Sequence, residues 1–353
     1  MAPARIPVAV LGATGLVGQR LVSLLADHPW FELAAVTGSP RSQGRRYGDV
    51  VRWRLPGDPP RAAAALVVQP SEPGLPGRLA FSALPSEIAG EIELSFAGAG
   101  YAVSSNARNH RMDEDVPLIL AETNAEHLAL IETQRRNRGW DRGLIVTNSN
   151  CTSMPLAMAL KPLDDAFGVE KVFVVSLQAL SGAGYPGVAS LDALDNVVPY
   201  IGGEEPKLEI EPRKMLGRLD ERANTTRLAP FTISAQTNRV AIRDGHLLCV
   251  SVELQEKATP AQAAKVMRAF RGRPQELELP TAPPQPLIVR DESDRPQPYR
   301  DRDAGNGMSI TVGRVRECPL FTLRFVALGH NTLRGAAGAA LLNGELLKAE
   351  GYL

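Results

Sequence analysis

Cys151 is the side chain best suited to covalent chemistry in this chain. Its neighbours Asn150 and Thr152 are polar, so they do not supply the apolar pocket that a buried structural thiol occupies. The next segment, 152–163, is a predicted helix with Pro155 in its first turn. The unpaired N–H groups and the dipole at a helix N-terminus favour negative charge. We therefore predict a nucleophile whose thiolate forms more readily than that of a free cysteine.

His246 is our choice for the group that moves protons at this thiol. Histidine titrates near neutral pH, which suits a partner of a cysteine nucleophile. The segments 239–242 and 246–254 are predicted strands joined by an Asp-Gly turn, which is typical of a hairpin. In that register Arg239 and His246 lie on one face. The other histidines lie at helix ends, on a helix or in an arginine-rich loop: His28, His110, His127 and His330.

The chain begins with a pattern typical of a dinucleotide site. A predicted strand, 6–11, is followed by a G-x-x-G-x-x-G sequence and then by a predicted helix, 21–26. Glycines let the backbone approach a pyrophosphate, whose charge lies at the helix N-terminus. A tight turn without a ligand is the alternative, which the strand–turn–helix context disfavours. The cofactor contacts predicted here are Gly12, Thr14, Gly15, Leu16, Val17 and Gly18.

The end of the second predicted strand, 31–37, indicates which dinucleotide binds. A site selective for NAD has a carboxylate near this point for the ribose 2′-hydroxyl. This sequence has no acid there and offers Ser39, Arg41 and Ser42, which suit a 2′-phosphate. The sequence therefore predicts NADP, or NADPH in the reduced form.

Polar residues also follow later strands of the first half. The elements predicted next are strands at 79–82, 101–104 and 118–120 and a helix at 126–136. Ligands bind a doubly wound parallel sheet at the carboxyl ends of its strands, so Ser82, Ala83 and Leu84 are predicted cofactor contacts. Arg111 lies in a loop after a strand and suits phosphate or carboxylate, although a surface arginine is an equal alternative.

The second half contains further candidates for ligand binding. Its predicted elements are a strand at 171–178, a helix at 204–216 and a last helix at 331–347 that returns to the first domain. Ser181 and Gly182 begin a glycine-rich loop that should bring backbone close to a ligand, and Asn331 is a further predicted cofactor contact. Glu204 and Lys207 share one helix face, for which a surface pair is the favoured interpretation.

Composition limits the classes of function. The chain has 353 residues with 44% apolar content, which suits two domains. Lys plus Arg equals Asp plus Glu at 39 each, so no global charge favours nucleic acid or an anionic membrane as a partner. No apolar run is long enough to span a bilayer, and we expect a cytoplasmic protein. The three cysteines lack the paired spacing of a metal site, so none is predicted.

These features predict an α/β chain of two domains and a terminal helix. Residues 1–150 should form a Rossmann-type, doubly wound parallel sheet that binds NADP. Residues 151–330 should form an α+β catalytic domain with a mainly antiparallel sheet. Residues 331–353 should contain a C-terminal helix that packs on the first domain.

Taken together, these stretches resemble aspartate-β-semialdehyde dehydrogenase of the branch found in archaea, fungi and some bacteria. The resemblance covers nearly the whole chain. Its motifs lie at 12–18, 81–86, 148–152, 178–187, 201–207, 239–246, 303–314 and 329–338. Two positions depart from the pattern, Ser149 and Ala121, where proline is frequent, and neither removes a reacting group.

The resemblance implies a role for each reacting residue. Cys151 would form an acyl-thioester, and His246 would be the acid/base. Asn150 and Gln178 would orient substrate and intermediate. The implied substrate contacts are Arg239 to the α-carboxylate, Glu204 to the amino group, and Arg111 with Lys207 to phosphate. The implied reaction is reversible reduction of 4-aspartyl phosphate by NADPH, in a homodimer or homotetramer whose second domain serves dimerisation.

Other functions share parts of this pattern. Malonyl-CoA reductase and N-acetylglutamyl-phosphate reductase use the same thiol–histidine chemistry, so residues of the pocket must separate them. A binding protein that only senses NADP is the alternative outside enzymes. Retention of both Cys151 and His246 argues against it.

Arg41→Ala should weaken binding of NADP far more than binding of NAD, because only NADP carries the 2′-phosphate that this guanidinium is predicted to contact. Binding titrations with both cofactors measure the two dissociation constants. Equal losses for both would show that Arg41 does not contact the 2′-phosphate.

Overall fold

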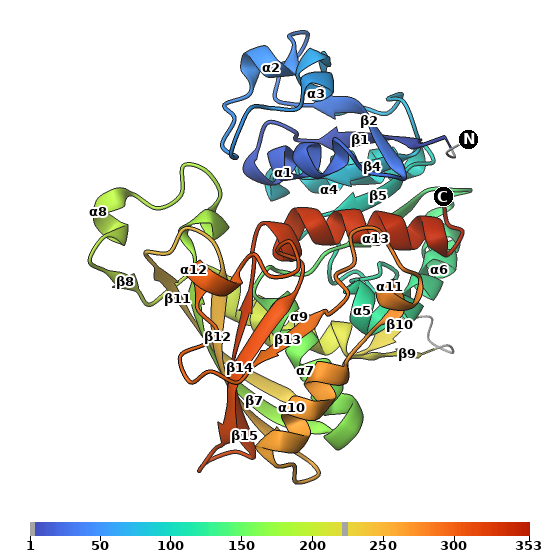
Figure 1. The fold of residues 1–353 in the computed structure, drawn as a ribbon. Coiled ribbons are helices and arrows are strands. Elements are labelled where there is room, and N and C mark those ends of the chain that lie inside the picture. The colour runs from blue at the N-terminus through green and yellow to red at the C-terminus, as the bar shows by residue number, and fades with distance from the viewer. Residues whose placement is uncertain (1–3, 221–224) are drawn as a thin grey trace.

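Two sheets organise the chain in the computed structural model, which describes residues 4–220 and 225–353. Residues 6–147 supply a six-stranded sheet and residues 169–329 a seven-stranded sheet, the upper and lower parts of Figure 1. A two-stranded ribbon, β9 (Arg218–Asp220) with β10 (Thr225–Arg227), lies beside the second sheet. No helix of the described residues is long and apolar enough to cross a membrane.

The first sheet is parallel throughout, with strand order β3-β2-β1-β4-β5-β6. Its strands are β1 (Ile6–Leu11), β2 (Phe31–Thr37), β3 (Val68–Gln69), β4 (Leu79–Ser82), β5 (Ala102–Ser105) and β6 (Leu144–Thr147). The order reverses between β1 and β4, so the loops after these two strands lie side by side at one edge.

Helices cover both faces of this sheet, which confirms the doubly wound prediction. The helices around the sheet are α1 (Leu16–Leu25), α2 (Tyr47–Val50), α3 (Arg61–Ala65), α4 (Ser86–Gly98), α5 (Ala121–Asn124), a 3₁₀ turn (Ala125–Ala129), α6 (Leu130–Arg138) and α13 (Gly338–Ala349). One apolar core joins α1, α6 and α13 to the sheet, and another joins α4 to its opposite face. The predicted strand at 118–120 is only a bridge from Leu118 to Thr147, because α5 begins at Ala121.

The second sheet is mixed, with order β13-β14-β15-β12-β7-β11-β8. Its strands are β7 (Val169–Gln178), β8 (Val197–Val198), β11 (Thr232–Val240), β12 (His246–Leu254), β13 (Leu287–Arg290), β14 (Ile310–Glu317) and β15 (Leu323–Gly329). Only β7 with β11 and β13 with β14 pair in parallel, so the mainly antiparallel prediction is confirmed.

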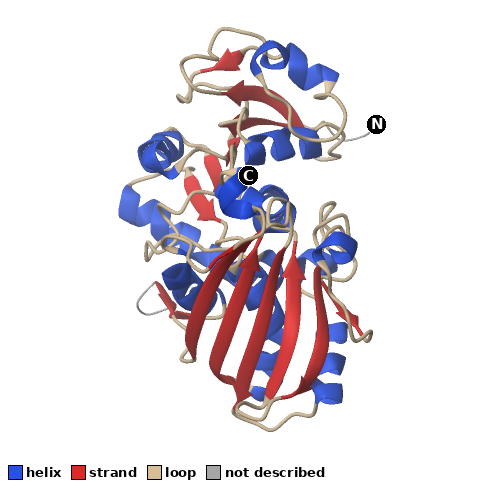
Figure 2. Ribbon diagram, turned by 90° about the vertical axis from the view of Figure 1, so that its left-hand side faces the viewer, coloured by secondary structure: helices blue, strands red, loops and turns tan. Residues whose placement is uncertain are grey.

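Helices pack on one face of this second sheet only. The elements of this half are α7 (Ser153–Phe167), a 3₁₀ turn (Leu180–Ala183), α8 (Ser190–Ala193), α9 (Glu204–Met215), α10 (Pro260–Ala269), α11 (Arg273–Glu276) and α12 (Pro298–Asp301). Side chains of α7, α9 and α10 share one apolar core with the strands. Figure 2 shows the other face without a helix from the described chain.

The predicted hairpin of 239–242 with 246–254 is wrong. β11 and β12 do not pair with each other, because β7 lies between them. Their connection passes over the end of β7. There the N–H groups of Leu180 and Ser181 donate to the carbonyls of Ile242 and Arg243. The Asp-Gly pair therefore lies where the chain bends between the two strands, but the backbone partners of this connection come from the 3₁₀ turn that follows β7.

The C-terminal segment returns to the first sheet, as predicted, after a π-helical turn at Leu333–Ala337. Arg334 in that turn is 1% exposed and donates to both carboxylate oxygens of Glu122, with 2.9 Å between Nη1 and Oε1. Ser104 in β5 also donates to the carbonyl of Ala340, at 2.9 Å. Figure 1 shows α13 lying between the two sheets.

Arg334→Met should lower the free energy of unfolding by about 3–5 kcal/mol, because it leaves the Glu122 carboxylate buried without its partner. Urea unfolding measures the loss. Arg273→Met is the control and should change unfolding little, because the ion pairs that it breaks are exposed. The double variant Arg334→Met with Glu122→Leu should recover most of the loss. A double variant as unstable as Arg334→Met alone would contradict this explanation.

Candidate active site

Cys151 and His246 meet where the two halves of the chain join. The Cys151 Sγ lies 3.3 Å from His246 Nε2, although the residues are far apart in sequence. Cys151 is half-buried and lies two residues before α7, whereas His246 begins β12 and is fully buried. The predicted pairing of a thiol with this histidine is therefore present in the structure.

The expectation of an easily formed thiolate is wrong for this buried sulfur. Burial raises the pKa of the Cys151 thiol to about 12, and the Glu204 carboxylate adds to the rise, against the guanidinium groups of Arg111 and Arg239. The helix N-terminus does not offset this effect, because its first N–H groups already have a partner. Asn150 Oδ1 accepts from the N–H groups of Thr152 and Ser153, at 2.8 and 3.3 Å.

Glu204 gathers three predicted residues around one carboxylate. It accepts from Asn150 Nδ2 at 2.9 and 3.0 Å, from Lys207 Nζ at 2.8 Å and from Gln178 Nε2 at 3.4 Å. Glu204 is only 9% exposed. The interpretation of Glu204 and Lys207 as a plain surface pair is therefore wrong, because the pair faces the domain junction.

Arg111 is held by a residue that the sequence did not single out. Its Nη1 donates to Glu211 Oε1 at 3.0 Å and its Nη2 to the carbonyl of Asn106 at 2.8 Å. The other oxygen of Glu211 accepts from the backbone N–H of Asn150. The Arg111 Nε is buried and has no partner among the described residues. The spacing from Glu204 to Glu211, two helical turns, was the signal that could have identified Glu211.

Three strands place Arg239, Gln178 and His246 in one row. Arg239 in β11 pairs with Gln178 in β7, and the antiparallel register of β12 sets His246 on the other side of Gln178. All three side chains are buried on the sheet face that α7 covers. The prediction that Arg239 and His246 share a face is thus confirmed, through a central strand instead of a hairpin.

A cleft of about 240 Å³ connects the thiol with the glycine-rich loop of the first sheet. Its lining includes Leu16, Val17, Arg111, Cys151, Ser181, Gly182 and Asn331. Asn331 Nδ2 donates to the Ser181 hydroxyl at 2.8 Å and its Oδ1 accepts from the Gly245 N–H at 2.9 Å. The C-terminal segment closes one wall. A Cβ on Gly335 would lie 2.6 Å from that of Cys151.

The remaining predicted cofactor contacts surround the same edge of the first sheet. Gly12 has φ of +75°, and a Cβ there would lie 2.8 Å from the carbonyl oxygen of Ala83. Only glycine therefore permits this approach of the loops after β1 and β4. Ser82 ends β4, and Ala83 and Leu84 follow it in the second loop. The turn of Ser39 and Ser42 borders Thr14, and Arg41 within it is exposed.

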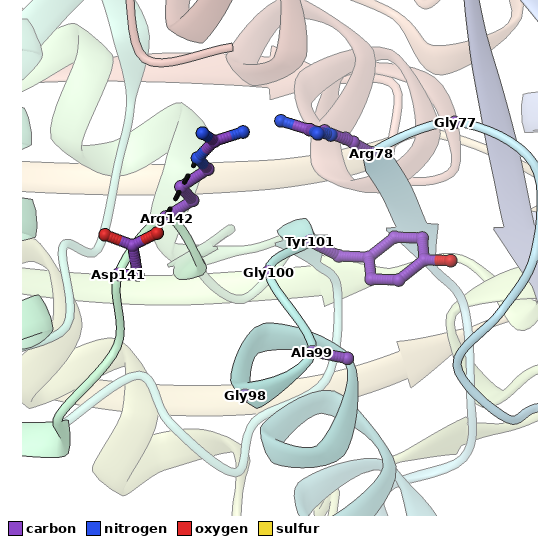
Figure 3. Close-up of a pocket in the computed structure, with 8 residues that line it drawn as sticks. All are labelled: Gly77, Arg78, Gly98, Ala99, Gly100, Tyr101, Asp141 and Arg142. Atoms are coloured by element: carbon purple, nitrogen blue, oxygen red, sulfur yellow. Dashed lines mark ion pairs between the residues drawn. The ribbon is translucent and has the colours of Figure 1, made fainter.

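Other cavities lie away from this chemistry. Figure 3 shows one of about 440 Å³ at the opposite edge of the first sheet, where the guanidinium groups of Arg78 and Arg142 point toward each other. It contains no nucleophile, and Asp141 pairs with Arg142 there. Within the described ranges, no group of three or more His, Cys, Asp or Glu is placed to hold a metal ion.

Known proteins share this whole architecture. Two family models match: semialdehyde dehydrogenase, NAD binding domain, over residues 7–131, and semialdehyde dehydrogenase, dimerisation domain, over residues 160–334. An aspartate-semialdehyde dehydrogenase of Archaeoglobus fulgidus is 50% identical over 347 residues, which cover 98% of this chain and 99% of that protein. A malonyl CoA reductase (NADP) of Metallosphaera sedula is 42% identical over 349 residues, 98% of this chain and 97% of that protein.

A solved structure agrees with the sequence comparison. The crystal structure of aspartate semialdehyde dehydrogenase with NADP from Candida albicans matches with a TM-score of 0.92 at 39% identity. The match covers 99% of this chain and 100% of that one. The arrangement of both sheets is therefore shared along the full length.

Alkylation of Cys151 by iodoacetamide should accelerate through pH 10 without levelling, because the raised pKa keeps the thiol protonated and each pH unit increases the thiolate fraction about tenfold. A Cys151→Ser variant measures the background from the other two cysteines. A rate that levels off below pH 9 would show that the helix N-terminus prevails over burial.

Proposed function

The chain belongs to the aspartate-semialdehyde dehydrogenase family, and on that premise we propose how its own residues carry out the reaction. It is an NADP-dependent oxidoreductase. The reaction is the reversible reduction of L-4-aspartyl phosphate to L-aspartate 4-semialdehyde and phosphate. It belongs to the biosynthesis of lysine, threonine, methionine and isoleucine.

The contact of Cys151 Sγ with His246 Nε2, at 3.3 Å, is the observation that supports a thioester route. Cys151 attacks the acyl carbon and displaces phosphate, so the acyl group is held on sulfur. When bound, NADPH supplies the hydride that reduces this thioester. His246 is the acid/base for the oxygen and the sulfur of the tetrahedral intermediate. The same steps in reverse oxidise the aldehyde with phosphate as acceptor.

The charges around the thiol suit a small substrate with an amino group, a carboxylate and a phosphate. We assign the α-carboxylate to Arg239, whose planar guanidinium matches it. Glu204, a buried carboxylate, takes the α-ammonium group. We assign the phosphate to Arg111 and Lys207. The buried Nε of Arg111 has no partner among the described residues, so it can donate to a phosphate oxygen. Asn150 and Gln178 orient the substrate through their shared contact with Glu204.

The edge of the first sheet fits NADP. The backbone of Gly12 to Gly18 approaches the pyrophosphate, since Gly12 has the positive φ that such a turn needs. Ser39, Arg41 and Ser42 hold the 2′-phosphate at the exposed rim. Further contacts are assigned to Thr14, Leu16, Val17, Ser82, Ala83, Leu84, Ser181, Gly182 and Asn331.

The match to a dimerisation domain makes the enzyme a homo-oligomer. We assign the contact to the face of the second sheet that the described helices leave open. Phe173, Val175 and Leu247 point to that face and remain only half-buried, and Cys249 is exposed there. A homodimer is the smallest assembly that covers this face of the sheet. A homotetramer would contain the same contact twice.

We propose one role for each of three successive segments of the chain. Residues 1–150 bind NADP, residues 151–330 supply catalysis and dimerisation, and residues 331–353 pack on the first domain. A cytoplasmic location stays a prediction from the sequence.

The test compares two acyl groups in the same enzyme preparation. Phosphate-dependent reduction of NADP⁺ with aspartate semialdehyde should exceed NADPH oxidation with malonyl-CoA in kcat/KM, because Glu204 offers a carboxylate for an amino group that malonyl-CoA lacks. Spectrophotometry at the NADPH absorbance measures both. A higher value for malonyl-CoA would contradict the assignments of Glu204, Arg111 and Lys207.

Glu204→Gln is the matched variant for this test. It should narrow the preference for aspartate semialdehyde over succinate semialdehyde, which differs only in lacking the amino group. An unchanged preference would show that Glu204 does not bind the ammonium group of the substrate. The proposed thioester route would not be affected by that result.

A further inference from the structure

Glu93 in α4 is a buried carboxyl group outside the cleft. Its side chain is 0% exposed, and its Oε1 accepts from the Ser105 hydroxyl at 2.6 Å. Its Oε2 is also buried and has no hydrogen-bond partner among the described residues. The nearby cations, His110 and Arg111, form their ion pairs with other acids. An ionised carboxylate with one unpaired oxygen is costly in such a place.

Two hydroxyl groups at the end of the first sheet lie against this carboxyl. Ser82 ends β4 and pairs with Ser105, which ends β5, and both are 0% exposed. The Ser82 hydroxyl lies beside the Glu93 carboxyl, although its oxygen has no hydrogen bond of good geometry among the described residues. Hydroxyl groups carry no charge, so they do not offset an ionised carboxylate as a cation would. A protonated carboxyl can accept from Ser105 at one oxygen and donate to Ser82 from the other.

The same two serines hold the start of the loop that carries Arg111. The Ser105 Oγ accepts from the N–H of Ala107 at 3.0 Å. The carbonyl of Ser82 accepts from the backbone N–H and from the side-chain amide of Asn106, at 3.1 and 2.8 Å. The carbonyl of Asn106 in turn accepts from Arg111 Nη2 at 2.8 Å. The buried carboxyl therefore lies beneath the first residues of the loop whose guanidinium we assign to phosphate.

Helix α4 holds the middle of this loop as well. Asn109 Nδ2 donates to the carbonyl of Ser86 at 2.9 Å, and His110 Nε2 lies 3.3 Å from the carbonyl oxygen of Gly90. Ser86, Gly90 and Glu93 follow one another at four and three residues, so they lie along one side of the helix. One side of α4 thus contacts the loop at three successive points, and Glu93 is the only one of the three that acts through a side chain.

We propose that Glu93 is a neutral carboxylic acid that positions the Arg111 loop for phosphate without placing a negative charge behind it. An ionised carboxylate here would repel a bound phosphate and would offset the guanidinium that holds it. The proposal rests on the proposed function, which assigns the phosphate to Arg111. Glu93 is a positioning residue and contacts neither substrate nor cofactor.

The surroundings of Glu93 favour the acid form. Burial is the largest influence and raises the pKa of the carboxyl, against the two hydroxyl groups and then the charges of His110 and Arg111. Because the net shift is upward, the carboxyl keeps its proton to a higher pH than an exposed glutamate does.

Infrared spectroscopy of the unliganded protein in D₂O at neutral pH tests the protonation state. We expect the difference spectrum between the parent protein and Glu93→Gln to contain the carbonyl stretch of a protonated carboxylic acid. A difference spectrum with the bands of a carboxylate instead would overturn the proposal. The measurement needs no substrate, so its result stands even if the protein fails to oxidise aspartate semialdehyde. Such a failure would count against the proposed function alone.

Two variants test the positioning role through the KM for phosphate in the oxidation of aspartate semialdehyde. Glu93→Gln keeps a neutral group that can accept and donate, so the KM should stay within about twofold of the parent value. Glu93→Leu has a similar size without polar atoms, and the KM should rise about three- to tenfold, as for the loss of one hydrogen bond, with a smaller change in kcat. Glu91→Leu, on the exposed side of the same helix, is the matched control and should change neither constant.

A KM that rises as much in Glu93→Gln as in Glu93→Leu would show that a negative charge is required and would overturn the proposal. An unchanged KM in Glu93→Leu would overturn the positioning role. If Glu93→Leu does not fold, the Gln variant alone still decides about the charge, because a KM raised by more than about threefold in that variant contradicts a neutral acid.

Discussion

The buried carboxylate of Glu211 is the contact on which the rest of the site depends. One oxygen accepts from the backbone N–H of Asn150, next to the nucleophile, and the other from the guanidinium of Arg111 in the first domain. Three residues later, Lys214 Nζ donates to the carbonyls of Arg111, Asp113 and Val116, at 2.8, 2.7 and 3.1 Å. Burial lowers the pKa of Lys214 to about 8, so the ammonium group is still charged at neutral pH. Helix α9 thereby fixes the thiol and the Arg111 loop relative to each other.

The same helix explains why the charged groups alternate around the cleft. Glu204, Lys207, Glu211 and Lys214 follow one another at three or four residues, so they lie along one side of α9. Each acid lies beside a cation: Glu204 accepts from Lys207, and Glu211 accepts from Arg111. A rigid helix sets these spacings more precisely than a loop would. The sheet contributes its own fixed row, because Arg239, Gln178 and His246 come from three adjacent strands.

Local patterns in the sequence predicted the pairing of strands better in the first domain than in the second. Strands β1, β2 and β4 were predicted with their observed bounds, because each is a short apolar run next to a turn or helix signal. The pairing of β11 with β12 failed, because hydrogen bonds between strands depend on β7, which lies far away in sequence. The contact between Cys151 and His246 was predictable, because few residue types suit a nucleophile and its proton-transfer partner. Glu211 was missed, since an acid on a helix has no distinctive signature until the fold places it beside Arg111 and Asn150.

The electrostatics of the thiol explain how one site can serve both directions. Burial and Glu204 favour the thiol, while Arg111 and Arg239 favour the thiolate. In the proposed assignment, a substrate phosphate held by Arg111 would bring negative charge that offsets this guanidinium and favours the thiol. The aldehyde brings no such dianion. Both guanidinium groups then act on the sulfur unopposed by phosphate, and the thiolate that attacks the aldehyde becomes easier to form. In the proposed assignment, the charge of the bound substrate would therefore shift the balance between the thiol and the thiolate of Cys151 in opposite senses for the two directions.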